Sequence, residues 1–283
     1  MTWLTSPDPE QFSAAAGDFL RTQPVRNTVA LSVTESLRAA GPQLYGDEPP
    51  LLGWWREPGG QVTGACVQTP PYPLVLTGAP EQAVRALAGE LAAAGRVLPA
   101  VNGSGRVAAL FAAEWQRRAG AAFAVHKRMR LYRLASLIPP EPAPPGCARV
   151  AGQADRELLA EWLQAAELEM GEPETGPVAP RVAARLSYSG LTVWETGGTA
   201  VSFAGLTRRL AGVVRVGPVY TPPALRRRGY AAGVTAAVSR AAVDAGAAEV
   251  LLFTDLANPT SNGIYQRLGY EPIEDHVILA FTS

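Results

Sequence analysis

Residues 219–231 read Val219-Tyr220-Thr221-Pro222-Pro223-Ala224-Leu225-Arg226-Arg227-Arg228-Gly229-Tyr230-Ala231 and join a strand-like run to a long helical pattern. The arginines put positive charge beside the first helical turn, where unpaired backbone N–H groups already favour an anion. Gly229 lets a ligand approach the backbone closely, and Ala231 is small. A solvated basic turn would account for the arginines alone. The strand, the glycine and the small residue together favour a pyrophosphate site.

The spacing of this loop separates it from two other phosphate-binding loops. A dinucleotide fingerprint needs several glycines, and this loop has one at the required place. A nucleotide-hydrolysing loop needs Gly-Lys-Ser/Thr, which is absent here. A nicotinamide dinucleotide and a hydrolysed nucleotide are therefore both disfavoured as ligands of this loop.

The spacing Arg226-x-x-Gly229-x-Ala231 resembles the Gln/Arg-x-x-Gly-x-Gly/Ala signature of the GCN5-related N-acetyltransferase (GNAT) family. The wider strings 219–231 and 252–270 resemble the branch related to the C-terminal part of glycine N-acyltransferases. The resemblance covers the second half of the chain and is weak before the proline-rich residues 138–146. It implies acetyl-coenzyme A as cosubstrate, held by Val219, Tyr220, Thr221, Arg226, Arg227, Arg228, Gly229, Tyr230, Ala231, Asn258, Ser261, Asn262 and Tyr265.

Gly217-Pro218 interrupts the strand that precedes the loop. Because proline cannot donate a ladder hydrogen bond, we expect a bulge here and a neighbouring strand that diverges. The resemblance implies that the pantetheine arm enters this gap and that main-chain groups near Val219 and Thr221 polarise the thioester carbonyl. An ordinary edge strand is the alternative.

Tyr265 is the candidate general acid. Asn258 suits an N-cap before Pro259, and Ser261, Asn262 and Tyr265 follow at helical intervals along one side. A phenol held at hydrogen-bond distance can donate a proton to a departing thiolate. A tyrosine that only packs against a sheet is the alternative.

The general base is harder to identify. The strand 212–220 holds no carboxylate, although many family members carry a glutamate there. Glu167 and Glu169, at the end of the first C-terminal helix, could act through a water, and we assign Glu169 as the second catalytic residue. A solvated helix end is the alternative for each.

Residues 138–147 hold five prolines and are expected to form a semi-rigid linker. After it, strands are expected at 148–151, 191–196, 200–208, 212–220 and 249–254, a final extended pair through residue 281, and helices at 155–170, 179–187, 229–245 and 259–268. Before it, strands are expected at 52–56, 62–68, 73–76, 96–101 and 122–134, and helices at 80–94 and 104–119. The similar order predicts a degenerate internal duplication.

The expected fold class is α/β (α+β), with tandem GNAT-like domains, each a mixed, mostly antiparallel sheet flanked by helices. Central strands are expected to splay in the C-terminal domain. Residues 1–137 would form a degenerate domain without a coenzyme A loop, 138–147 the linker and 148–283 the catalytic domain. The alternative to duplication is that the two halves share this order of helices and strands by chance, as any α/β domain can.

Composition restricts the partners. The 25 basic and 25 acidic residues balance, which argues against a nucleic-acid partner, including transfer RNA. No apolar run reaches membrane length, and residues 1–20 lack a basic region, so we expect no membrane partner and a cytoplasmic protein. Two histidines and two cysteines lie too far apart for a metal site. A monomer or homodimer is expected.

These observations predict an acyl-coenzyme A N-acyltransferase, with acetyl as the expected acyl group. It would act on a primary amine of a small molecule or amino acid by direct transfer in a ternary complex. The alternative is a non-catalytic coenzyme A-binding sensor or interaction protein.

Overall fold

The structure is a computed structural model, and it describes residues 1–173 and 178–282. The chain forms two compact units. Unit 1 comprises Met1–Met129 with Glu274–Ser283, and unit 2 comprises Arg130–Ile273. Both halves of the chain share one order of main elements: a strand, two helices, three strands, a helix, a strand, a helix and a strand. The repeated order agrees with the expected duplication.

Unit 1 contains a sheet with the strand order β1-β2-β3-β4-β5-β12. The pair β4 and β5 is parallel, and the other pairs are antiparallel. Its elements are β1 (Thr2–Ser6), α1 (Pro9–Thr22), α2 (Thr28–Ala40), β2 (Leu51–Arg56), β3 (Val62–Gln68), β4 (Leu74–Leu76), α3 (Glu81–Ala93), β5 (Ala100–Ser104) and α4 (Gly105–Ala119), followed by the first part of β6 (Ala122–Leu134) and the second part of β12 (Tyr270–Thr282).

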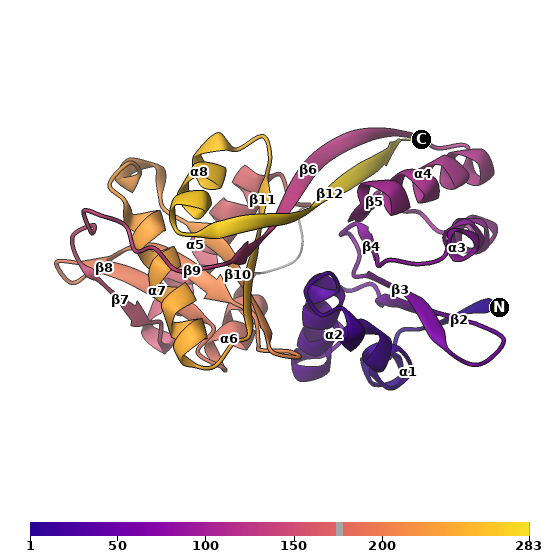
Figure 1. Ribbon diagram of the computed structural model, residues 1–283, viewed down its shortest axis with the longest axis horizontal. Coiled ribbons are helices and arrows are strands. Elements are labelled where there is room, and N and C mark those ends of the chain that lie inside the picture. Colours follow the sequence, from indigo (N-terminus) through magenta and orange to yellow (C-terminus); the bar gives the residue numbers. More distant parts are fainter. Residues whose placement is uncertain (174–177, 283) are drawn as a thin grey trace. The chain divides into compact units, whose positions relative to one another are not determined.

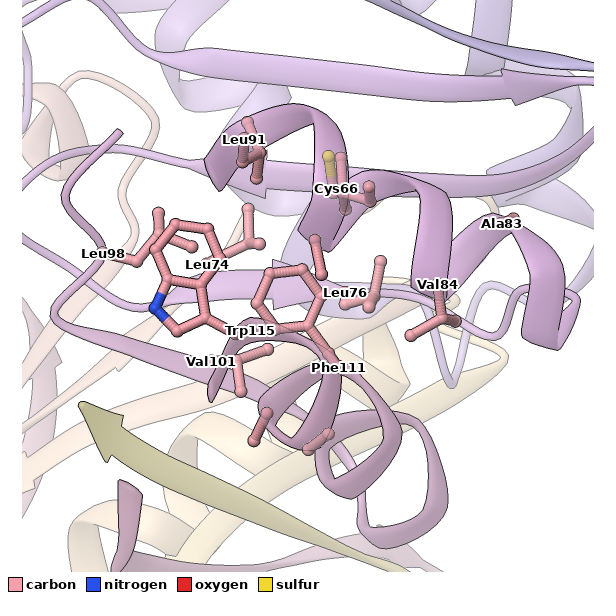
Figure 2. Packing of buried hydrophobic residues seen from close by; sticks show 14 of the residues in the cluster. Cys66, Leu74, Leu76, Ala83, Val84, Leu91, Leu98, Val101, Phe111 and Trp115 are labelled. Atoms are coloured by element: carbon pink, nitrogen blue, oxygen red, sulfur yellow. The ribbon is translucent and has the colours of Figure 1, made fainter. Parts of the chain in front are cut away.

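Helices cover both faces of this sheet (Figure 1). On one face α1 and α2 pack on β2 and β3, with Phe12 against Trp54. On the other, α3 and α4 enclose an apolar cluster that includes Leu74, Phe111 and Trp115 (Figure 2). The alternation along each strand therefore places apolar side chains on both faces.

Unit 2 repeats this plan with the strand order β6-β11-β10-β9-β8-β7. The pair β10 and β11 is parallel, whereas β7 to β10 form an antiparallel meander. Its elements are β7 (Cys147–Val150), α5 (Arg156–Met170), α6 (Ala179–Leu186), β8 (Leu191–Thr196), β9 (Thr199–Leu206), β10 (Val213–Tyr220), α7 (Tyr230–Asp244), β11 (Glu249–Asp255) and α8 (Pro259–Arg267).

The two faces of the unit 2 sheet have separate cores. Helices α5 and α6 cover Val193, Phe203 and Tyr220. Helix α7 covers the opposite face, which includes Val216 and Leu252 (Figure 1). Val219 packs on the α7 side and Tyr220 on the α5 side, as expected for neighbours in a strand.

Two strands are divided between the units. β6 enters unit 2 at Arg130, and β12 leaves it after Ile273. Within unit 1, β12 pairs with β5 from His276↔Ser104 to Ala280↔Ala100. Val277 and Leu279 of this segment belong to the same unit 1 core cluster as Phe111 and Trp115. The division differs from the expected boundaries, because residues 274–283 complete the N-terminal unit.

Most expected elements are present, with three differences. β12 is one continuous strand where an extended pair was expected. β5 begins at Ala100, four residues later than expected; Pro99 has no N–H to donate, although its carbonyl accepts from Phe281 N at 2.9 Å. β1, α1 and α2 were not predicted.

The proline-rich segment is held along unit 2. Ile138 N donates to Leu268 O at 3.0 Å, and Trp194 Nε1 donates to Pro145 O at 2.8 Å. Pro144 is buried beside Gly229 and Gly233. Cys147, expected in the linker, begins β7. Among the described residues, no helix combines the length and apolarity needed to cross a membrane.

Candidate active site

β10 separates from β11 in the middle of its length. Their ladder runs from Val213↔Glu249 to Val216↔Leu252, and within the described residues it ends there. β10 nevertheless continues to Tyr220 and β11 to Asp255. The separation begins at Gly217-Pro218, as the sequence predicted. It leaves the backbone edge of 218–220 without its parallel partner.

The loop after β10 reaches α7 through a 3-10 turn, Pro223–Leu225. Arg227 has φ +64° and Gly229 has φ +82°, so two residues of the loop adopt the left-handed conformation. Helix α7 begins at Tyr230, with Gly229 as its N-cap. Residues 226–229 are exposed. Left-handed residues that precede a helix N-terminus turn successive N–H groups toward one side, which is an arrangement that suits an anion.

The Arg226 side chain points back toward the end of β10 and not out from the exposed loop 226–229. Its Nε donates to Thr221 O at 2.9 Å, and its guanidinium carbon lies 5.7 Å from the centre of the Tyr220 ring. Arg227 and Arg228 are exposed and form no ion pair within the described residues. The positive charge available to a ligand therefore comes from Arg227 and Arg228. The Arg226 side chain instead holds the two ends of the loop together through Thr221 O.

The residues at the end of β10 are fixed by neighbouring side chains. Ser202 Oγ, on β9, is buried, donates to Tyr220 O at 2.8 Å and lies 2.9 Å from Thr221 Oγ1. Val219 pairs with Ala204. Burial raises the pKa of the Tyr220 phenol, and the Glu169 charge raises it further.

Helix α8 places its polar residues at the end of β11. Asn258 caps the helix, with its Oδ1 accepting from Ser261 N at 3.0 Å. Asn262 Nδ2 donates to Asp255 O and Asn258 O, each at 2.8 Å, and its Oδ1 accepts from Tyr132 at 2.9 Å. The Asn262 amide is thus occupied in holding the corner between β11 and α8.

Tyr265 is half-buried on α8. Its ring packs edge-on against Tyr270 at a centroid separation of 6.1 Å. Burial raises its pKa to about 12. The hydroxyl finds no hydrogen-bond partner among the described residues. Tyr265 and Val219 pack against the same core cluster, so the structure brings the candidate acid and the opened strand to one side of the sheet.

Both candidate bases are ion-paired. Arg226 Nη2 lies 2.7 Å from each carboxylate oxygen of Glu169, and Arg181 Nη2 lies 2.8 Å from Glu167 Oε2. Glu169 therefore joins the end of α5 to the loop, on the sheet face opposite Tyr265.

One residue near the separation was not selected from the sequence. Arg185, on α6, donates from Nη1 to Gly217 O at 2.9 Å. Nothing in its local sequence distinguishes it from other helical arginines, because the contact depends on tertiary packing.

Comparisons with known proteins agree with this geometry. Residues 156–270 match the Acetyltransferase (GNAT) family. No protein of curated function matches the chain. Several solved structures share the fold over most of the chain.

A GCN5-related N-acetyltransferase from Kribbella flavida is 22% identical, with a TM-score of 0.54, covering 79% of this chain and 89% of that one. One from Sphaerobacter thermophilus is 16% identical, with a TM-score of 0.60 and coverages of 98% and 94%. A tandem GNAT protein from the clavulanic acid biosynthesis pathway is 13% identical, with a TM-score of 0.60 and coverages of 99% and 98%. At these identities the likeness concerns the fold.

Proposed function

We propose that this chain transfers an acyl group from acyl-coenzyme A to a primary amine, because residues 156–270 match the Acetyltransferase (GNAT) family and a tandem GNAT protein shares the fold over 99% of the chain. The family match supports acyl-coenzyme A-dependent N-acetyl transfer in general. We further propose that the acceptor is a small amine or an amino acid, and that the acyl group passes to it directly in a ternary complex. The observation that carries it is the separation of β10 from β11 after Val216, next to the loop that opens α7.

The loop residues fit a pyrophosphate. N–H groups from Arg226 to Ala231 would bind the phosphate oxygens, with charge supplied by Arg227 and Arg228. Gly229 is required at φ +82°, where a side chain would be strained. The free edge of β10 near Val219 and Thr221 would bind the pantetheine arm and polarise the thioester carbonyl.

Acetyl-coenzyme A supplies an activated thioester. In the proposed step the amine nitrogen forms a bond to the carbonyl carbon, the carbon–sulfur bond breaks, and the amine loses its proton to water. With a pKa of about 12, Tyr265 is a weaker acid than a thiol, whose pKa is about 8.5. Tyr265 would therefore stabilise the departing thiolate as a hydrogen-bond donor, and solvent would complete its protonation.

Direct transfer agrees with the placement of the two cysteines. Cys66 is buried in unit 1, and burial raises its pKa to about 12, which suppresses thiolate formation. Cys147 is exposed at the start of β7, outside the opened strands. Neither supports an acyl-enzyme.

We further propose that unit 1 binds no coenzyme A. The connection from β4 to α3 is Thr77-Gly78-Ala79-Pro80, and it carries no arginine. β4 and β5 pair through Val75↔Asn102, and the adjoining core is filled by large side chains such as Phe111 and Trp115 (Figure 2). Calorimetric titration of the full chain with coenzyme A should therefore give one site per chain.

The second candidate is a non-catalytic coenzyme A-binding protein. The ion pairing of Glu167 and Glu169 favours it, because neither carboxylate is left free to take the amine proton.

Turnover separates the two functions. The full chain is incubated with acetyl-coenzyme A and a panel of primary amines and amino acids, and released thiol is measured. Binding with acceptor-dependent thiol release supports transfer. Binding without release from any amine supports the second candidate, and no binding at millimolar coenzyme A contradicts both.

A further inference from the structure

The bulge that opens β10 leaves one backbone carbonyl outside the strand ladder. Val216 pairs with Leu206 and Val219 pairs with Ala204, so Gly217 and Pro218 together face Gly205. Gly217 has φ +145°, which turns its peptide out of regular strand geometry. A half-buried carbonyl in this position needs a donor from elsewhere in the fold.

Arg185 supplies that donor across the sheet face covered by α5 and α6. Its half-buried guanidinium donates to Gly217 O at 2.9 Å. It reaches the carbonyl over Gly205, where an added Cβ would lie 2.5 Å from Arg185 Nη1 and 2.8 Å from Gly217 O. Gly205 therefore leaves the space that this hydrogen bond requires.

The same strand end is held at two further carbonyls. Ser202 binds Tyr220 O, and Arg226 binds Thr221 O. Three side chains from three different elements thus fix the carbonyls of the segment 217–221, at the place where β11 no longer pairs with it. β9 still pairs with Val219 and Tyr220 on the other edge, so these three contacts add to the restraint on a segment that lacks its parallel partner.

We propose that Arg185 is a positioning residue for acyl transfer. By holding Gly217 O it sets the bulge, and the bulge sets the direction of the free β10 edge that would meet the thioester. The inference rests on the proposed function. Arg185 acts on the geometry of the reacting carbonyl site and not on the pyrophosphate loop, so catalysis and coenzyme A binding should respond differently to its loss.

Three variants and two controls test this separation. Arg185→Ala removes the donor, Arg185→Lys keeps a charged donor, and Gly205→Ala blocks the same contact sterically. Arg209→Ala is the matched control, because Arg209 Nη1 also donates to a backbone carbonyl of unit 2, Ala245 O, at 2.5 Å. Gly152→Ala, where an added Cβ meets nothing within 4 Å, controls for Gly205→Ala.

Loss of one charged hydrogen bond should lower kcat by about 10- to 100-fold in Arg185→Ala and Gly205→Ala. The dissociation constant for coenzyme A, measured by calorimetry, should change by less than about threefold. Arg185→Lys should lie between wild type and Arg185→Ala. Wild-type kcat in Arg185→Ala, or equal losses of kcat and of coenzyme A affinity, would overturn the proposal.

Amide hydrogen exchange keeps the test independent of turnover. In Arg185→Ala, exchange at Val219 to Thr221 should be at least about tenfold faster than in wild type and Arg209→Ala. Unchanged exchange refutes the positioning role whether or not wild type is active. Inactive wild type with the expected exchange change refutes the proposed function and leaves the bulge contact supported.

Discussion

Arg226 Nη2 lies 2.7 Å from both carboxylate oxygens of Glu169, and this contact ties the end of α5 to the loop before α7. The two residues were assigned from the sequence to different tasks, phosphate binding and proton removal. Their contact supports a shared task for the two residues. Glu169 holds the Arg226 side chain against Thr221 O, and this contact shapes the loop before α7.

Glu169→Gln should weaken coenzyme A binding by no more than about fivefold, since the two side chains are 44% and 43% exposed and such pairs contribute about 1 kcal/mol or less. Loss of a general base would instead lower kcat by about 10²- to 10⁴-fold. Coenzyme A affinity and kcat are measured for this variant and for Glu161→Gln, an exposed site on the same helix. A hundredfold fall in kcat with normal affinity would restore Glu169 as the base.

Gly229→Asp should abolish the rise in melting temperature that coenzyme A gives. The substitution puts a side chain at φ +82° and a negative charge beside the expected phosphates. Gly197→Asp is the control, because Gly197 has φ +56°, lies in unit 2 and has open space around its Cβ position. Normal binding by Gly229→Asp would show that the loop is misassigned.

Tyr265→Phe should lower kcat by about 10²-fold, as expected for the loss of one hydrogen-bond donor to a developing negative charge, and leave coenzyme A affinity nearly unchanged. Burial raises the pKa of Tyr265 to about 12, which makes the phenol a hydrogen-bond donor and a weak acid. The group stays protonated until the pH approaches 12, so its ionisation should cause no loss of kcat between pH 7 and 10.

Tyr270→Phe serves as the control for Tyr265→Phe. The Tyr270 hydroxyl is buried and lies 2.7 Å from Ser239 Oγ. Its loss should lower the melting temperature and spare kcat. Equal kcat values for wild type and Tyr265→Phe would leave Tyr265 a packing residue.

Leu279→Ala should destabilise unit 1 by about 2–5 kcal/mol, although residue 279 follows all of unit 2 in the sequence. Leu279 is 4% exposed and belongs to the unit 1 core. Denaturant unfolding followed by hydrogen exchange in β5 measures the effect, with exposed Thr282→Ala as the control. If Leu279→Ala reduced hydrogen-exchange protection only in unit 2, the assignment of this part of β12 to the unit 1 sheet would be wrong.

Local signals allowed much of unit 2 to be predicted. The Gly197-Gly198 turn and the apolar runs around it place β8 and β9 within about two residues of their observed bounds. The sequence predicts an extended pair where β12 is one strand. The first residues of β12 belong to unit 2 and the rest to unit 1, and this division depends on long-range contacts that no local pattern shows. Helix α1 has a local signal in the sequence, since Asp8 caps it and Pro9 begins it.

The site was predictable where backbone conformation carries it and less so where side chains pair. Gly229, Pro218 and the N-cap Asn258 each require a particular local geometry, which short motifs reveal. The Arg226–Glu169 contact spans 57 positions and the Arg185–Gly217 contact spans 32, so no local pattern indicates them. The same limit applies to the contact of Asn262 with Tyr132, which spans 130 positions, whereas its contacts with Asp255 and Asn258 are local.

The pairing of β12 with β5 also bears on how the protein is made. A ribosome adds roughly 5–20 residues per second, and N-terminal domains generally fold first. Here β5 emerges early, while its neighbour His276–Ala280 is translated only after unit 2, on the order of ten seconds later. The nascent first unit therefore exposes an unpaired β5 edge until residues 276–280 are made, and such an edge can pair with strands of other chains.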